Sequence, residues 1–172
     1  MTARLIVLRH AKSAWPEGVP DPERPLAGRG RRDAPAAGRW LREAGHAPDL
    51  VLCSTALRTR QTWDLVSQEL QGAPRVLFEL RLYAAGARRL RGVLREVPEE
   101  RRCVLLIGHQ PGVQDLVLSL AGGGDDEART RVRGRFPTCA IAVLTVPGRW
   151  SELAEDSALL DEFTIPRGPV EG

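Results

Sequence analysis

Five short apolar runs, separated by segments of helical periodicity, constrain the fold of this chain more than any other feature of its sequence. The runs occupy residues 4–8, 50–53, 75–78, 103–107 and 140–146. Between them, apolar side chains recur at helical spacing in 29–44, 56–71, 87–96 and 112–120. Strands that alternate with helices in this way predict βαβ crossovers. We therefore expect a three-layer α/β/α sandwich with a mostly parallel central sheet.

The segments between these elements are rich in residues that end helices and strands. Residues 11–27 contain too many prolines for a helix and predict a loop. Residues 122–126 predict a turn, and a tight turn at 147–148 leads into 150–154, so that a final strand pair could add an antiparallel edge. The Gly- and Pro-containing tail 166–172 is expected to fray. No linker or repeat divides the 172 residues, which predicts a single domain spanning 1–172.

Composition places the chain among ordinary globular proteins. Hydrophobic residues make up 42% and charged residues 27% of the sequence, and its apolar runs are shorter than the roughly 18 residues that cross a bilayer. The first residues lack the long apolar region of a secretory signal, so we expect a cytoplasmic protein that does not bind membranes. Cys53, Cys103 and Cys139 are widely spaced within apolar runs, which predicts buried thiols rather than disulfides or a zinc site.

The net charge of +3 suggests nucleic-acid binding until the basic residues are located. Lys12 is the only lysine among 25 basic residues, and most arginines alternate with acidic or apolar residues. The densest basic groups lie in 29–32 and 129–135, and no aromatic residue is interleaved with them. Because aromatic residues are only 5% of the chain, few side chains are available to stack on bases, and nucleic-acid binding is disfavoured.

Polar residues that suit chemistry follow three of the predicted strands. Arg9 and His10 end the first strand, Ser54 ends the second with Arg58 four residues later, and His109 follows the strand at 103–107. Because ligands of parallel α/β sheets gather beyond the carboxyl ends of strands, we expect these side chains to converge. Two of the chain's three histidines occupy such positions.

Each of these residues also has a purely structural interpretation. A histidine after a strand is often only a satisfied polar residue, and His46, beside a helix end, fits a cation at a helix C-terminus. Arg58 and Arg60 suit a solvated helix face, and Ser54 suits a helix cap. The combination, rather than any single residue, favours a functional site.

Arginines beside neutral imidazoles suit a dianionic tetrahedral group, because the guanidinium fork matches phosphate oxygens. Histidine can also act as a nucleophile and carry a covalent phosphoryl group. Two histidines could instead bind a metal, but no carboxylate accompanies them at the strand ends and the arginines would repel a cation. The residues therefore predict a phosphate site that needs neither metal nor cofactor.

Three motifs resemble those of the histidine phosphatase superfamily, which has the phosphoglycerate-mutase-like fold. They are Leu8-Arg9-His10-Ala11-Lys12-Ser13, the segment from Ser54 to Thr62, and Ile107-Gly108-His109-Gln110-Pro111-Gly112. Two further segments, Arg24-Pro25-Leu26 and Arg135-Phe136-Pro137-Thr138, are similar to the small SixA-like branch. In the first motif Ala11 stands where the family has glycine, and in the second Thr59 stands in an alanine place. The resemblance extends from residue 4 to about 155.

The resemblance implies a role for individual residues. His10 would be the phosphorylated nucleophile, with Arg9, Arg58 and His109 around the phosphate, and Ser13 is a further candidate for substrate binding. The proton donor is not evident, because Gln110 stands where some members have an aspartate. Glu79, at the end of the third strand, is our candidate, although it could equally be an exposed acid at a strand end.

Substrate and partners are expectations from the same resemblance. The interval between the second and third motifs is too short for a large lid, which favours a bulky substrate such as a phosphohistidine protein. A phosphoramidate also has less need of a general acid. The alternatives are a small-molecule phosphomonoesterase and a non-catalytic phosphate-binding module. We expect a monomer or a small homo-oligomer.

Overall fold

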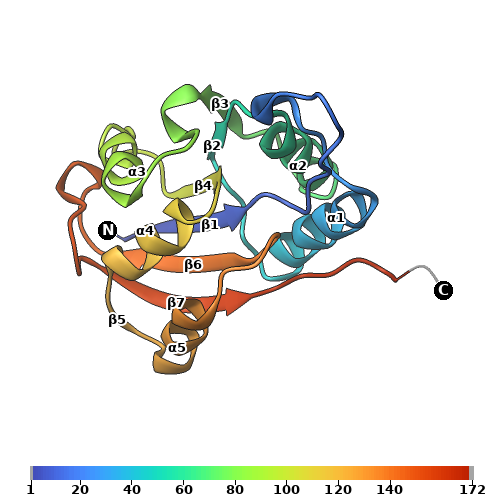
Figure 1. The fold of residues 1–172 in the computed structure, drawn as a ribbon. Coiled ribbons are helices and arrows are strands. Elements are labelled where there is room, and N and C mark those ends of the chain that lie inside the picture. The colour runs from blue at the N-terminus through green and yellow to red at the C-terminus, as the bar shows by residue number, and fades with distance from the viewer. Residues whose placement is uncertain (1, 171–172) are drawn as a thin grey trace.

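The computed structural model describes residues 2–170 and is built around a seven-stranded mixed sheet (Figure 1). The strand order is β3-β2-β4-β1-β6-β7-β5. The strands are β1 (Ala3–Arg9), β2 (Leu50–Ser54), β3 (Arg75–Glu79), β4 (Cys103–Gly108), β5 (Ala121–Gly124), β6 (Ile141–Val146) and β7 (Ala158–Thr164). The α-helices are α1 (Gly28–Glu43), α2 (Leu57–Ser67), α3 (Ala87–Leu94), α4 (Gly112–Leu120) and α5 (Asp126–Gly134).

The sheet is parallel in its first half and mixed in its second. β1, β2, β3 and β4 run parallel to one another, whereas β6 is antiparallel to both β1 and β7. β5 pairs with β7 in parallel and forms the outer edge. The mostly parallel α/β architecture is thus confirmed. The prediction that the antiparallel pair forms an edge is wrong, because β6 lies inside the sheet beside β1.

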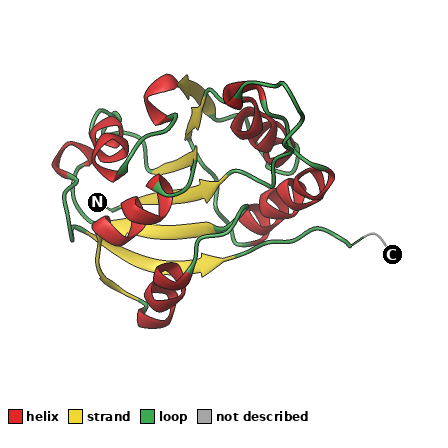
Figure 2. Cartoon of the chain, in the orientation of Figure 1, coloured by secondary structure: helices red, strands yellow, loops and turns green. Residues whose placement is uncertain are grey.

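Helices cover both faces of the sheet, as Figures 1 and 2 show. Successive β1 residues alternate between two cores: Leu5 and Val7 pack with α3, α4 and α5, whereas Ile6 and Leu8 pack with α1 and α2. This alternation follows from the period of two in a strand. It also explains why the strands are continuous apolar runs, since both of their faces are buried.

The predicted strands and helices agree with the structure except in the last third of the chain. The turn expected at 122–126 is instead the glycine-containing strand β5 running into α5. Residues 150–154 begin with a short 3-10 helix, η3 (Trp150–Glu152), and do not form a strand. Trp150 is buried there, which ties this connection to the core, and the antiparallel partner of β6 comes later, as β7.

The proline-containing segment after β1 is a loop, as predicted, with a short 3-10 helix η1 (Asp21–Glu23). A β-bridge between Ser13 and Leu26 closes it against the start of α1. Gly30 of α1 is needed there, because a Cβ at that position would lie 2.2 Å from the Lys12 carbonyl oxygen.

The predicted tail 166–172 is described as far as residue 170, and residues 171–172 lie outside the described part. Within it, the Gly168 amide donates to Asp33 Oδ1 of α1 at 2.9 Å, and Arg167 donates to the Thr138 carbonyl at 3.0 Å. These bonds hold the start of the tail against α1 and against the segment that precedes β6. None of the helices in residues 2–170 combines the length and the apolar character needed to span a bilayer.

Candidate active site

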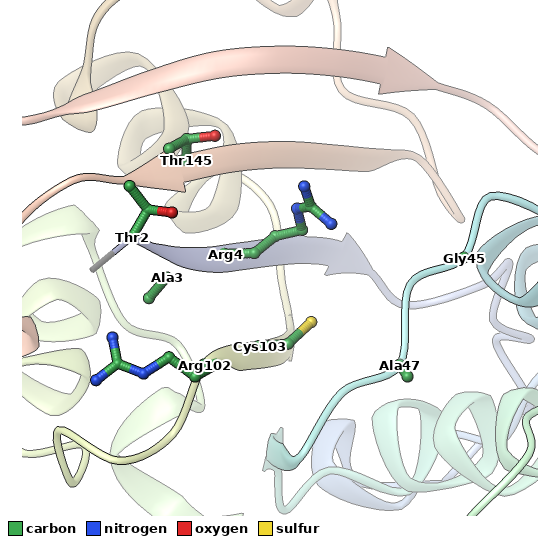
Figure 3. A pocket seen from close by; sticks show the side chains of 8 residues that line it. All are labelled: Thr2, Ala3, Arg4, Gly45, Ala47, Arg102, Cys103 and Thr145. Carbon is green, nitrogen blue, oxygen red and sulfur yellow. The ribbon is translucent and has the colours of Figure 1, made fainter.

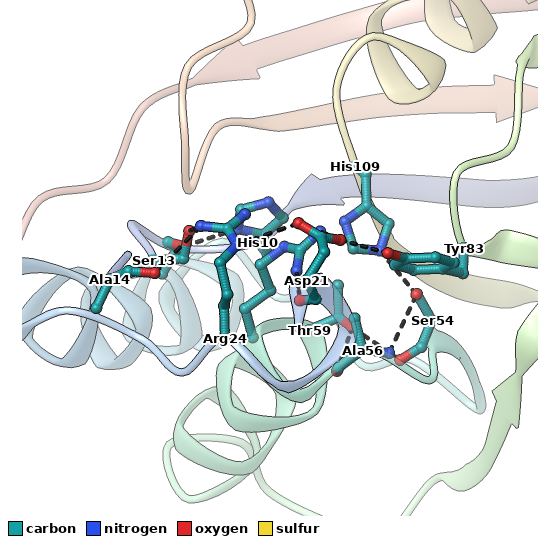
Figure 4. Close-up of polar contacts among 12 residues, drawn as sticks. His10, Ser13, Ala14, Asp21, Arg24, Ser54, Ala56, Thr59, Tyr83 and His109 are labelled. Atoms are coloured by element: carbon teal, nitrogen blue, oxygen red, sulfur yellow. Dashed lines mark hydrogen bonds and ion pairs between the residues drawn. The ribbon is translucent and has the colours of Figure 1, made fainter. Parts of the chain in front are cut away.

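The polar residues that follow β1, β2 and β4 come together at the carboxyl ends of these neighbouring strands. Figure 4 shows His10, Ser54 and His109 around one centre, with Asp21 and Tyr83 beside them. The ring centroids of His10 and His109 are 5.3 Å apart. The parallel register explains the convergence, because it aligns Arg9 with Gly108 at the ends of β1 and β4.

His10 is buried and held in one tautomer. Its Nδ1 lies 2.7 Å from the Ala11 carbonyl oxygen, which can only accept, so Nδ1 carries the proton and Nε2 keeps its lone pair. Burial lowers the pKa of His10 to about 3, and the charges of His109, Arg58 and Arg9 act in the same direction. The ring is therefore neutral and nucleophilic at physiological pH.

The alanine that follows His10 fits the loop without strain. Ala11 is fully buried, and its amide donates to Thr62 Oγ1 of α2 at 3.0 Å. It is not among the described residues with positive φ, so this position does not need the freedom of glycine. The departure from the family motif at Ala11 is thus compatible with the observed backbone.

His109, the residue after β4, faces the same centre. Its Nε2 lies 2.7 Å from Ser54 Oγ, and the Tyr83 ring meets it edge-on at 5.6 Å between centroids. Burial lowers the pKa of His109 to about 4, and the positive charge of Arg58 contributes. Both imidazoles are therefore neutral above about pH 5.

The two arginines leave hydrogen-bond donors unused beside the histidines. Arg9 donates one terminal NH to the Phe136 carbonyl at 3.0 Å, and Arg58 donates its two terminal nitrogens to Asp21. The Nε atoms of Arg9 and Arg58 and the Nδ1 atom of His109 are buried without a partner among the described residues. Buried polar atoms rarely remain unpaired in a folded protein. Arg101 Nε also lacks a partner in residues 2–170, but it lies away from the histidines, so it is the grouping of three such atoms beside His10 that supports an anion-binding site.

Sequence reasoning did not identify Asp21 as a site residue. Its carboxylate accepts bonds from Arg58 at 3.0 Å, from Arg24 at 3.1 Å and from the Tyr83 hydroxyl. The Tyr83 hydroxyl, followed by Arg58 and Arg24, lowers the pKa of Asp21 to about 2. Asp21 lies in a loop without periodicity, so its direction could not be predicted. The nearest sequence feature that pointed to the site was the family-like segment Arg24-Pro25-Leu26.

The remaining candidates have clear neighbours. Ser13 is buried, and its Oγ accepts from Arg24 at 2.9 Å, so it lies in the network that surrounds Asp21. Glu79, our candidate proton donor, forms an ion pair with Arg81 at 3.0 Å, and this pair lowers its pKa. Glu79 is aligned with Ser54 in the pairing of β2 and β3, but its carboxylate bonds to Arg81 and to neither histidine, and its lowered pKa is the opposite of what a general acid needs.

Two further observations concern metal binding and a pocket elsewhere on the sheet. In residues 2–170, no group of three or more His, Cys, Asp or Glu side chains is arranged to hold a metal ion. A pocket of about 320 Å³ lies at the amino ends of β1 and β4, where Arg4, Arg102 and Cys103 line it (Figure 3). None of the catalytic candidates lines that pocket.

Comparison with known proteins agrees with the geometry. The model of the histidine phosphatase superfamily (branch 1) matches residues 5–86. The uncharacterised protein Rv1276c of Mycobacterium tuberculosis is 41% identical over 162 residues, which cover 93% of this chain and all of that protein.

Solved structures are similar over nearly the whole chain. A protein from Nakamurella multipartitia, described as a candidate SixA phosphohistidine phosphatase, superposes with a TM-score of 0.86 at 32% identity and covers 96% of this chain and 97% of its own. A protein from Agrobacterium tumefaciens with the same description superposes with a TM-score of 0.79 at 27% identity, over 95% of this chain and 99% of its own.

Proposed function

The chain belongs to the histidine phosphatase superfamily, in its SixA-like branch, and is a phosphatase; on this premise we propose that it hydrolyses phosphohistidine in proteins through a phosphorylated His10. The observation that carries the proposal is that His10 Nε2 is free and that three buried polar atoms beside it, Arg9 Nε, Arg58 Nε and His109 Nδ1, lack partners among the described residues. A nucleophile and an anion site thus share one centre.

In the first step, His10 Nε2 attacks the phosphorus atom of the substrate. A P–N bond to His10 forms while the P–N bond of the substrate breaks. The leaving ring nitrogen keeps the electron pair, and because the other nitrogen of that ring already carries a proton, neutral imidazole is released. The donors of Arg9, Arg58 and His109 stabilise the charge on the phosphoryl oxygens. In the second step a water molecule attacks the phosphorus atom, which releases phosphate and returns His10 to its neutral form.

The carboxylates near the site favour a substrate that needs little help from a general acid. Asp21, with a pKa of about 2, is ionised at neutral pH, and Glu79 is paired with Arg81. The ring of phosphohistidine can already carry a proton on the nitrogen that is not bonded to phosphorus, so it leaves as neutral imidazole, whereas an alkoxide leaving group requires a donor. The donor-poor site is therefore better suited to phosphohistidine than to an alkyl phosphate.

The interval between α2 and β4 also supports a large substrate. It contains β3, a short 3-10 helix η2 (Leu80–Leu82) and α3, with no inserted subdomain to close over the histidines. A protein surface can therefore approach the phosphoryl site directly.

The test is to compare phosphohistidine peptides with sugar phosphates and p-nitrophenyl phosphate as substrates of the purified protein. We expect the highest kcat/KM for phosphohistidine, together with an acid-labile, alkali-stable phosphoryl group on His10 after rapid quenching. Faster turnover of a sugar phosphate would instead favour a small-molecule phosphomonoesterase. A label on a serine would refute the role of His10.

A further inference from the structure

A second pocket, of about 340 Å³, lies between α1, the segment that precedes β6 and the start of the tail. In Figure 1 the chain after β7 runs past α1, and residues 167–170 of this segment line the pocket. The charged side chains that line the pocket are Arg29, Arg32, Arg135, Arg167 and Asp33. Arg32 already has an interaction partner, and the other three arginines still outnumber Asp33, the one carboxylate among the described lining residues.

Asp33 holds two of the lining arginines in place but does not neutralise the positive charge of the pocket. The residue is 2% exposed, and its Oδ1 accepts from the Gly168 amide at 2.9 Å. Its Oδ2 pairs with Arg29 at 3.4 Å and with Arg167 at 3.6 Å. One buried carboxylate therefore orients two guanidinium groups, and even without Arg32 the described lining side chains carry more positive than negative charge. Such pre-oriented arginines bind carboxylates with little loss of side-chain entropy.

The pocket shares a wall with the loop that carries His10. In the segment that precedes β6, the Phe136 carbonyl accepts from Arg9 of the active site, and the Thr138 carbonyl accepts from Arg167 of the pocket, both at 3.0 Å. Two residues of one short segment thus contact the active site and the pocket. Because one short segment joins the two sites, we take the occupant of the pocket to belong to the macromolecule that places its phosphoryl group at His10.

We propose that the pocket binds an acidic segment of the phosphorylated protein whose phosphohistidine reacts at His10. The proposal rests on the proposed function. Charge complementarity favours carboxylates, because arginine carries the excess charge and pairs with them through two parallel hydrogen bonds. None of the described residues that line the pocket is aromatic, which disfavours a single-stranded nucleic acid that would stack its bases.

The kinetic test uses two phosphohistidine peptides that differ only in a flanking run of glutamates or glutamines. We expect the wild type to prefer the glutamate peptide by about tenfold in kcat/KM at low salt, and the preference to shrink as salt is added. Arg135 is exposed, so Arg135→Glu should remove the preference without unfolding the protein. Turnover of p-nitrophenyl phosphate, which is too small to reach the pocket, should change by less than about twofold.

The matched control is Arg75→Glu, which makes the same change in net charge. Arg75 is exposed at the amino end of β3, on the opposite edge of the sheet from β5, and does not line the pocket. This variant should keep the preference for the glutamate peptide. Equal kcat/KM for the two peptides in the wild type, or equal losses in Arg135→Glu and Arg75→Glu, would overturn the proposal.

A binding measurement separates the pocket from the chemistry. Fluorescence anisotropy of a labelled poly-glutamate peptide, without any phosphoryl group, should show binding to the wild type that Arg135→Glu weakens and Arg75→Glu retains. This result would support the pocket even if phosphohistidine were not a substrate. Conversely, turnover of phosphohistidine without binding of poly-glutamate would refute the pocket alone. Tighter binding of a labelled oligouridine at the same residues would also refute it.

Discussion

The sharpest test of the active-site geometry compares Arg58 with Arg60, two arginines on the same helix. Arg58 is buried at the start of α2. Its two terminal nitrogens donate to Asp21, and its Nε, beside the histidines, has no partner among the described residues. Arg60 lies two residues later, about 200° around the helix, and is exposed. We therefore expect Arg58→Ala to lose activity and Arg60→Ala to retain it.

The expected loss follows from the contacts that Arg58 makes. Removal of one pre-oriented donor from a charged transition state typically lowers the rate by roughly 10²–10³. Arg58→Ala should therefore lower kcat/KM for p-nitrophenyl phosphate by about this factor, whereas Arg60→Ala should change it by less than about twofold. Arg58→Lys keeps the charge and loses the fork, so its activity should lie between those of Arg58→Ala and the wild type.

Stability must be measured in the same variants. Loss of Arg58 leaves Asp21 bonded to Arg24 and Tyr83, so the carboxylate is not orphaned and the cost in unfolding free energy should be about 1–3 kcal/mol. Steady-state kinetics and thermal melts together separate chemistry from folding. Equal activity losses in Arg58→Ala and Arg60→Ala, at equal melting temperature, would refute the placement of Arg58 at the phosphate.

Three more predictions concern the histidines and the absence of a metal requirement. His10→Ala should abolish both the acid-labile phosphoryl label and turnover, whereas His109→Ala should lower turnover by roughly a hundredfold and still label slowly. Activity should survive EDTA, and a loss that zinc or magnesium restores would contradict a phosphate site made by arginines. The pKa of His10, about 3, lies below its unfolded value of about 6.5, so the unfolded chain binds the proton first as the pH falls. The wild type should therefore lose about 2 kcal/mol more unfolding free energy than His10→Ala between about pH 7 and pH 5, as measured by urea titration. If the unfolding free energies of the two proteins fell in parallel with pH, His10 would not be the source of the pH dependence.

The sheet and the positions of the two histidines could be predicted because one physical cause governs both. A parallel strand covered on both faces must be apolar throughout, so its end is marked by the first polar residue. His10 and His109 are such residues, and the parallel pairing of β1 and β4 brings their rings within 5.3 Å of each other. Neither step requires knowledge of a loop conformation.

The last third of the chain lacks this kind of signal. α5 buries only Ala128 and Val132, so it has almost no apolar periodicity. β5 is largely glycine, and its backbone approaches Asp156 so closely that a Cβ at Gly122 would lie 2.2 Å from the Asp156 carbonyl oxygen. A register shift between β6 and β7 further disrupts their alternation. Long-range pairing, rather than local propensity, determines these elements.

Asp21 could not be predicted as a site residue for a different reason. Its partners Arg58 and Tyr83 are 37 and 62 positions away, and the loop that carries Asp21 has no period from which its direction could be inferred. Yet this carboxylate has two consequences for the site. It holds the Arg58 fork in place while leaving Nε for an anion, and with a pKa of about 2 it is ionised at neutral pH and has no proton to give to a leaving group. The loop after β1 therefore contributes, through Asp21, to the proposed choice of a substrate that needs no general acid.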